Sequence, residues 1–278
     1  MCAEKAEVVL KLREALRVPV YAPCIRPDVL SGLSEAEISS LEVRRGNRKV
    51  KLGELFEIEG DGSAKPEDLT VRLIGDLTKV RQVGFEMEAG RIVVEGPIGL
   101  LTGEHMRGGS IEVRGDAGSW LGARMRGGSI EVHGSAGHYV GSAYRGAREG
   151  MRGGSIVIHG SAGYELGNFM RGGSIEVHGP VGLFPGIHMQ GGAILIRGDC
   201  EGRPGAFMRG GKLVLCGHVP AVLPGFSILR ISKSVKFGGE RIAGPFYTFV
   251  GDLTENGDGR LHVAKRPNEH LAFYERYL

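Results

Sequence analysis

Short runs in which branched apolar residues alternate with mostly polar ones recur along the middle of the chain. The runs are Ile111-Glu112-Val113, Ile130-Glu131-Val132, Ile156-Val157-Ile158, Ile175-Glu176-Val177 and Ile194-Leu195-Ile196. This alternation predicts short strands with one buried face. The first apolar positions of the runs are expected to form one buried ladder, and the third positions a second.

A four-residue turn precedes each of these runs and sets a fixed period. Its copies begin at Met106, Met125, Met151, Met170, Met189 and Met208, in steps of 19, 26, 19, 19 and 19 residues, and Met87 begins a degenerate first copy. A constant period in this range is typical of repeat proteins, in which each unit packs on its neighbours. The methionines at this phase are expected to pack at a corner rather than to bind a soft metal.

Glycines at a constant phase predict that every repeat has the same backbone corners. They include Gly115, Gly118 and Gly122 in one repeat and the pair that ends each turn, for which positive φ is expected at Gly153 and Gly172. Small residues stand before one corner at Ala117, Ala136 and Ala162. The fold prediction is therefore all-β: a single-stranded, right-handed parallel β-helix of about seven 19-residue rungs over residues 75–225.

The two ends of the chain lack the repeat and are predicted to cap the raw edges of such a stack. In the mixed α/β segment 1–74, Glu7–Leu12 is expected to be a strand and Ser34–Ile38 the start of a helix capped by Ser34 and Glu37. In the segment 226–278, Phe246–Val250 and Arg260–Ala264 flank a turn and predict a β-hairpin.

Composition and charge exclude several classes of protein. The 48 glycines among 278 residues are too many for a conventional α/β enzyme domain, and a net charge of +3 does not favour nucleic-acid binding. No apolar run approaches the roughly 20 residues of a membrane span, and the first residues do not resemble a signal peptide. We therefore expect a soluble, cytoplasmic protein.

Stacked polar residues are the first candidates for chemistry. His133, His159 and His178 share an outward phase that is expected to hold no carboxylate, so no metal site is predicted there. A row of arginines begins at Arg107 and continues at Arg126, Arg152, Arg171 and Arg209. Glu112, Glu131 and Glu176 are expected to lie near enough to offset this charge; otherwise the row is a solvated face or a surface for an acidic partner.

The cysteines and the glycine turns predict no cofactor site in this chain. Cys2, Cys24, Cys200 and Cys216 form no Cys-x-x-Cys pair, so reduced thiols are expected rather than a zinc or iron–sulfur site. No lysine and Ser/Thr pair follows a glycine turn to bind phosphate, and no catalytic triad or carboxylate pair stands out from the repeats. No catalytic, cofactor-binding or metal-binding residue is predicted.

One insertion breaks the period. The segment 142–150 stands where other repeats have two residues, and insertions in repeat proteins often form the binding face. Tyr144, Arg145 and Arg148 supply the side chains that interfaces favour, and they are the predicted contacts with a partner; the alternative is a passive surface loop.

These features resemble the C subunit of formylmethanofuran dehydrogenase. The resemblance rests on the Met-x-Gly-Gly turns, the inserted Tyr144-Arg145-Gly146, the segment Phe184–Gly192, the segment Glu201–Gly205, and the tail from Pro245-Phe246-Tyr247 through Asn268–Leu271. It covers residues 75–271 well and the N-terminal segment more loosely. The glycine corners also occur in the C-terminal β-helix of glutamate synthase, so the insertion and the tail carry more of the likeness.

The resemblance implies a scaffold subunit of a tungsten or molybdenum complex that reversibly reduces CO2 to formylmethanofuran with low-potential electrons, as in methanogenesis. It implies that tungsto- or molybdopterin, iron–sulfur clusters and a dinuclear metal site belong to other subunits. The implied partners are the pterin–metal, amidohydrolase-like and ferredoxin-like subunits, and methanofuran by way of the complex. The resemblance places the predicted contacts Tyr144, Arg145 and Arg148 on the partner or methanofuran side of this chain. Two alternatives remain: the C subunit of a formyltransferase/hydrolase complex, and an interaction domain of the glutamate synthase type.

Overall fold

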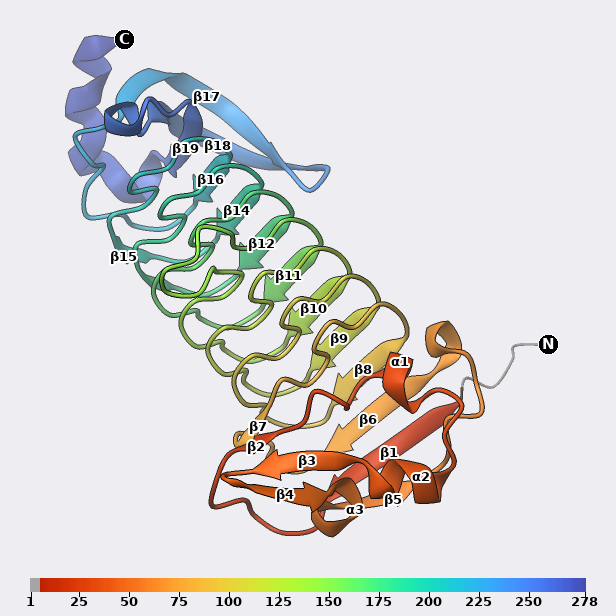
Figure 1. Ribbon diagram of the computed structural model, residues 1–278. Helices are drawn as coiled ribbons and strands as arrows, with labels where there is room; N and C mark the ends of the chain where they lie inside the picture. Colours follow the sequence, from red (N-terminus) through yellow and green to blue (C-terminus); the bar gives the residue numbers. More distant parts are fainter. Residues whose placement is uncertain (1–5) are drawn as a thin grey trace.

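The computed structural model describes residues 6–278 and consists mostly of β-strands (Figure 1). Successive turns of the chain stack along one long axis, with the N-terminal elements at one end and the C-terminal elements at the other. A thirteen-stranded sheet runs along the stack in the order β17-β18-β19-β16-β14-β12-β11-β10-β9-β8-β6-β1-β5. Among the described residues, no helix is both long and apolar enough to cross a membrane.

The bounds of the elements follow the repeat in the middle of the chain. The strands of the main sheet are β1 (Glu7–Leu12), β5 (Phe56–Glu59), β6 (Thr70–Ile74), β8 (Arg91–Val94), β9 (Ser110–Val113), β10 (Ser129–Val132), β11 (Ser155–Ile158), β12 (Ser174–Val177), β14 (Ala193–Ile196), β16 (Lys212–Leu215), β17 (Ser227–Phe237), β18 (Glu240–Gly251) and β19 (Gly259–Ala264). The smaller sheets contain β2 (Val20–Tyr21), β3 (Glu42–Arg45), β4 (Arg48–Lys51), β7 (Val80–Arg81), β13 (Val181–Leu183) and β15 (Cys200–Gly202). The helices are α1 (Pro27–Leu30), α2 (Glu35–Ser40), α3 (Leu52–Leu55), η1 (Pro66–Asp68), η2 (Leu253–Glu255) and η3 (Arg266–Tyr277).

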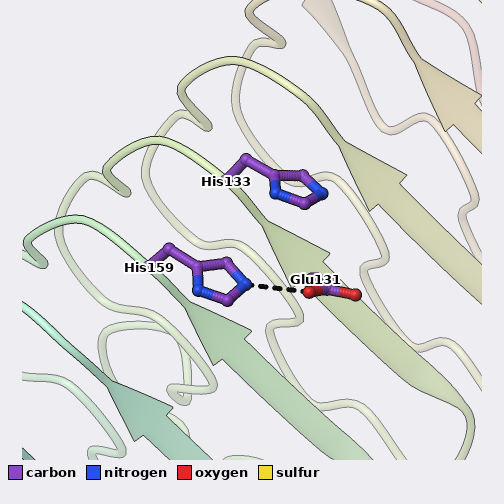
Figure 2. A group of neighbouring side chains, drawn as sticks. All are labelled: Glu131, His133 and His159. Carbon is purple, nitrogen blue, oxygen red and sulfur yellow. Dashed lines mark hydrogen bonds and ion pairs between the residues drawn. The ribbon is translucent and has the colours of Figure 1, made fainter.

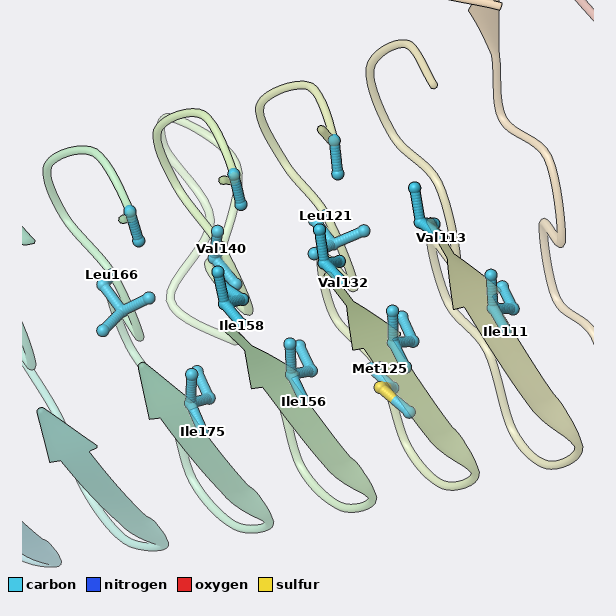
Figure 3. Packing of buried hydrophobic residues seen from close by; sticks show 14 of the residues in the cluster. Ile111, Val113, Leu121, Met125, Val132, Val140, Ile156, Ile158, Leu166 and Ile175 are labelled. Carbon is cyan, nitrogen blue, oxygen red and sulfur yellow. The ribbon is translucent and has the colours of Figure 1, made fainter. Parts of the chain in front are cut away.

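The repeat strands pair in parallel and in register. Ile130 of β10 lies opposite Ile111 of β9 and Ile156 of β11, and the same register continues through β12 and β14. The two predicted apolar ladders point inward, and Figure 3 shows them packed against Leu121, Val140 and Leu166 from the other wall of each coil. The predicted core residues are at most 1% exposed: Ile130, Val132, Ile156, Ile158, Ile175 and Val177. Both ladders are confirmed.

A second line of backbone contacts joins the coils on the side away from these strands. Ala117, Ala136 and Ala162 form consecutive parallel bridges there, and β13 and β15 extend the line as a two-stranded sheet. The methionines of the turn are buried, as predicted: Met106, Met125, Met151, Met170 and Met189 are 0% exposed. Each coil therefore closes around a narrow apolar interior that the next coil continues.

The two glycines of each turn differ in role, and only the second has the positive φ that was predicted. Positive φ occurs at the second glycine of each pair, +86° at Gly154 and +82° at Gly173, so the prediction for Gly153 and Gly172 is wrong. The first glycine is needed for close approach instead. A Cβ on Gly153 would lie 2.4 Å from the carbonyl oxygen of Arg126, and one on Gly172 2.3 Å from that of Arg152.

The elements predicted outside the repeat are present. Glu7–Leu12 forms β1, and Ser34 caps α2 in a reciprocal capping box with Glu37. At the other end β18 and β19 pair antiparallel, which confirms the hairpin. The main sheet continues past both predicted boundaries, because β6 pairs with β8 and β19 pairs with β16. The division into caps and rungs stays a prediction.

Candidate functional site

The insertion lies between β10 and β11 and leaves their register undisturbed. Its base is closed by backbone hydrogen bonds: Ala143 N–H donates to Asn168 (3.0 Å), Gly150 N–H to Phe169 (2.9 Å) and Met151 N–H to Gly141 (2.8 Å). Between these closing contacts Arg145, Gly146 and Arg148 are exposed, whereas Tyr144 is half-buried against the stack.

Tyr144 anchors this loop to a coil that precedes it by 40 residues. Its hydroxyl donates a hydrogen bond to Oε1 of Glu104, a carboxylate that is only 6% exposed. Gln82 Nε2 donates to the other oxygen of the same carboxylate (2.9 Å), and His105 Nε2 lies 3.8 Å from its Oε1. Sequence reasoning missed Glu104 because it is one charged residue among many. The sequence does mark it in one way: Glu104 places a carboxylate at a position of the repeat where the preceding repeat has Phe85 and the following repeat has Ala123.

Burial sets the electrostatics of this cluster. It raises the pKa of Tyr144 above its ordinary value, and the hydrogen bond to Glu104 adds to the effect. Burial also lowers the pKa of His105, helped by the positive charge of Arg124. Tyr144 therefore stays protonated at neutral pH and acts as a hydrogen-bond donor that holds the loop.

The two arginines of the insertion face solvent. Arg145 and Arg148 are exposed, and within residues 6–278 neither forms an ion pair. The acidic residue beside them, Glu149, is fully engaged instead: its carboxylate lies 2.6 Å from Arg152 and 3.0 Å from Arg171. The loop thus offers two guanidinium groups that lack ion-pair partners in the described chain, beside a carboxylate that Arg152 and Arg171 already share.

A hollow of ≈ 360 Å³ lies beside the insertion and includes Arg148 in its wall. Three stacked rings line it, with centroids 4.5 Å apart between Phe169 and His188 and 5.1 Å apart between His188 and Phe207. Arg209 completes the basic side of the hollow and is paired with Glu255 at 2.6 Å. These stacked rings were missed in the sequence, although they are 19 residues apart and the repeat alone could have shown them.

The acidic partners predicted for the turn arginines are wrong. Arg107 pairs with Glu88 at 2.8 Å, Arg152 and Arg171 pair with Glu149, and Arg209 pairs with Glu255. The strand glutamates are used elsewhere, because residues two apart on a strand share a face. Glu112 therefore meets Arg114 two positions along its own strand, and Glu176 meets Arg197, two positions past its cross-strand partner Leu195, at 2.7 Å.

The same alternation corrects the interpretation of the histidine row. A carboxylate does share its face: Glu131 Oε1 lies 2.8 Å from His159 Nε2, and Glu176 Oε1 lies 3.0 Å from His178 Nε2. The absence of a carboxylate was one reason to predict no metal site, and that reason fails.

The cysteines in the described part of the chain are free thiols. Burial raises the pKa of both Cys24 and Cys200 to about 11, so these thiols stay protonated at neutral pH. Cys216 is also free, and Cys2 lies outside the described residues.

A relative from Methanothermobacter thermautotrophicus, the C subunit of tungsten-containing formylmethanofuran dehydrogenase 2, is 55% identical over 267 residues, 96% of this chain and 99% of the relative. The chain belongs to the family of formylmethanofuran dehydrogenase C subunits. The protein of the same name from Methanothermobacter wolfeii is 42% identical over 98 residues, so that match spans about a third of either chain, 35% and 36%. Molybdenum-containing members of the family match over similar lengths. No family model matches the chain.

A solved structure shares the architecture of this family member. It is a chain of the formyltransferase/hydrolase complex from Methylorubrum extorquens, crystallised in complex with methylofuran. The two chains are 32% identical with a TM-score of 0.79, and the match covers 92% of this chain and 99% of the other. The likeness therefore includes both ends of the stack as well as its repeats.

Proposed function

We propose that this chain is the non-catalytic scaffold subunit of a formylmethanofuran dehydrogenase complex, which reversibly reduces CO2 and fixes it as formylmethanofuran with low-potential electrons. The observation that carries the proposal is the 55% identity to a C subunit of this enzyme along 99% of that relative's length. A stack of coils suits a scaffold, because each coil packs mainly on its neighbours and leaves a long outer surface for other subunits.

The proposed architecture is a right-handed parallel β-helix of about seven 19-residue rungs over residues 75–225, capped by residues 1–74 and 226–278. The in-register parallel ladder and the line of alanine bridges support it. Tungsto- or molybdopterin, iron–sulfur clusters and the dinuclear metal site are assigned to other subunits of a cytoplasmic complex. These are the pterin–metal, amidohydrolase-like and ferredoxin-like subunits.

Within this proposal the insertion is the partner- or methanofuran-side contact. Arg145 and Arg148 are exposed and form no ion pair in the described chain, and guanidinium groups bind carboxylates through two parallel hydrogen bonds. The Tyr144 hydroxyl donates a hydrogen bond to Glu104 and is not free for a partner. Tyr144 therefore contributes to the interface by holding the loop and by the exposed part of its ring. Carboxylates of a partner protein, or of a glutamate-rich tail on methanofuran, suit such a loop.

Double substitution of Arg145 and Arg148 by alanine tests this contact. Truncating a buried interfacial arginine–carboxylate pair costs about 2–5 kcal/mol, so the variant should assemble poorly or raise the apparent KM for methanofuran. The melting temperature of the isolated chain should not change, because neither side chain forms an ion pair in the described residues. Tandem purification of the tagged protein with its partners, followed by steady-state kinetics, measures both effects.

Two controls make the test specific. The double variant R44A/R48A removes two exposed arginines from the N-terminal sheet and should assemble normally. The double variant R145K/R148K keeps the charge without the planar fork and should restore assembly only partly. Normal assembly and normal kinetics of R145A/R148A would return the insertion to a passive surface loop.

The runner-up function is the C subunit of a formyltransferase/hydrolase complex, which handles formylated carrier without redox chemistry. The observation in its favour is the structural match at a TM-score of 0.79 to a chain of such a complex. Purification of the native assembly separates the two: tungsten or molybdenum with a pterin-type subunit supports the dehydrogenase, and a co-purifying formyltransferase without either metal supports the hydrolase.

A further inference from the structure

Two imidazoles and one carboxylate converge on the outer face of the strand ladder, where Glu131 belongs to β10 and His133 and His159 follow the ends of β10 and β11. Figure 2 shows the His159 ring directed at the Glu131 carboxylate, with the His133 ring beside it. One ligand atom from each residue lies within 4.8 Å of the other two, and the contact between His159 Nε2 and Glu131 Oε1 is 2.8 Å.

The backbone holds these side chains in place. His133 N–H donates to Val113 and His159 N–H to Val132, each at 2.9 Å, so the two histidines occupy equivalent positions on neighbouring coils. Their rings stack with centroids 5.2 Å apart and an angle of 14° between their planes. Both rings are partly exposed, His133 to 45% and His159 to 35%, so they can rotate toward a shared ion without disturbing the core.

The charges around this group distinguish it from the rest of the row. Glu112 pairs with Arg91 and Arg114, and Glu176 pairs with Arg197, so arginines neutralise the carboxylates of the coils on either side. Glu131 has no arginine partner in residues 6–278; its one ion-pair contact there is His159. The strand position opposite Glu131 on β11 is the neutral Val157. Among Glu112, Glu131 and Glu176, Glu131 is thus the one carboxylate without an arginine partner in residues 6–278, and His133 Nε2 also lies 3.5 Å from Glu112 Oε1.

We propose that Glu131, His133 and His159 bind one divalent cation of the zinc type. Two imidazole nitrogens and one carboxylate oxygen form a donor set that zinc accepts, with bonds of about 2.0–2.2 Å and a fourth position left to water or to a donor from a partner. Hard cations such as Mg²⁺ and Ca²⁺ prefer all-oxygen sites, so the two histidines disfavour them. This inference is independent of the proposed function, because it concerns the strand face and not the insertion.

Isothermal titration of the full-length chain, with any affinity tag removed, tests the site with Zn²⁺ alone. We expect one saturable equivalent, and Co²⁺ in its place should give the visible absorption bands of a tetrahedral nitrogen and oxygen site. H133N, H159N and E131Q should each weaken Zn²⁺ binding by about tenfold or more, since each removes one of three protein ligands. All three side chains are exposed enough that melting temperatures without metal should match the wild type.

The matched control is H178N. His178 lies on the same face one coil further, but its carboxylate partner Glu176 is already paired with Arg197. Its removal should leave Zn²⁺ affinity unchanged. Absence of saturable binding, or equal weakening by H178N and H159N, would overturn the proposed site; the second outcome would show unspecific binding along the histidine row.

Discussion

Substituting Tyr144 by phenylalanine removes one oxygen from the contact that ties the insertion to the stack. The hydroxyl donates to Glu104, a carboxylate 6% exposed, whose remaining donor in the described chain is Gln82 at 2.9 Å. A hydrogen bond to a charged acceptor stabilises a protein by about 1.5–3 kcal/mol. For large domains about 2–4 °C of melting temperature accompanies each kcal/mol, so Y144F should melt between about 3 and 12 °C lower.

The pH dependence gives this experiment a second readout. Burial and Glu104 raise the pKa of Tyr144 in the folded chain, so above about pH 10 the unfolded chain releases a proton that the folded chain retains. The stability contributed by Tyr144 is therefore complete below about pH 10 and declines as the pH rises. Tyr247, whose pKa is raised to about 12, adds the same dependence to both proteins, and their difference isolates Tyr144.

Thermal melts at pH values from 7 to 11 measure both effects. The control is Y164F, because Tyr164 is 43% exposed and its hydroxyl has no hydrogen-bond partner among the described residues. We expect the stability gap between wild type and Y144F to be constant near neutral pH and to narrow above pH 10, and Y164F to follow the wild type. If the wild type exceeded Y144F and Y164F in stability by the same amount at every pH, the assignment of Tyr144 as the anchor of the loop would be refuted.

Two further predictions concern the stack itself. Gly172→Ala should lower the free energy of unfolding by about 1–3 kcal/mol in chemical denaturation, because the added Cβ would lie 2.3 Å from the carbonyl oxygen of Arg152. The control is Gly146→Ala, whose added Cβ would have no atom within 4 Å. Only the positive φ of Gly146 disfavours alanine there, so this variant should lose less stability. Burial, and after it the charges of Lys212, Arg230 and Arg260, lowers the pKa of His262 to about 4. As the pH falls from about 6.5 to 4, this histidine therefore gains a proton in the unfolded chain but not in the folded chain. The wild type should lose stability across that window and H262N should lose less in thermal melts at pH 7, 5.5 and 4.5; identical slopes would contradict this account.

Much of the fold could be predicted because its information is local and repeats. Alternation along Ile130-Glu131-Val132 identifies the buried face of one strand, and the constant step to Ile156 or Ile175 places the next strands in register. Parallel pairing of identical units then aligns identical side chains. The capping box of Ser34 and Glu37 was predictable for the same reason, since its two members are three residues apart.

The errors at the turns arose where the backbone conformation of single residues mattered more than the spacing of the repeat. Gly153 and Gly154 are neighbours in the same turn, yet only the second is left-handed, and the first is small because another backbone crosses it. Left-handed backbone also occurs at Trp120 and Tyr139, where no glycine marks it. A repeat identifies where corners fall but not which residue of a corner turns the chain.

The sequence alone therefore determined the period, the two apolar ladders, the buried methionines and the existence of an exposed basic insertion. Only the tertiary structure decided which polar groups meet. Tyr144 and Glu104 are 40 residues apart, and Glu131 and His159 are 28 apart, neither a multiple of the 19-residue period. The physical reason is that a stacked coil brings each side chain beside the coils before and after it, whereas the insertion shifts the sequence spacing without shifting the register of the strands.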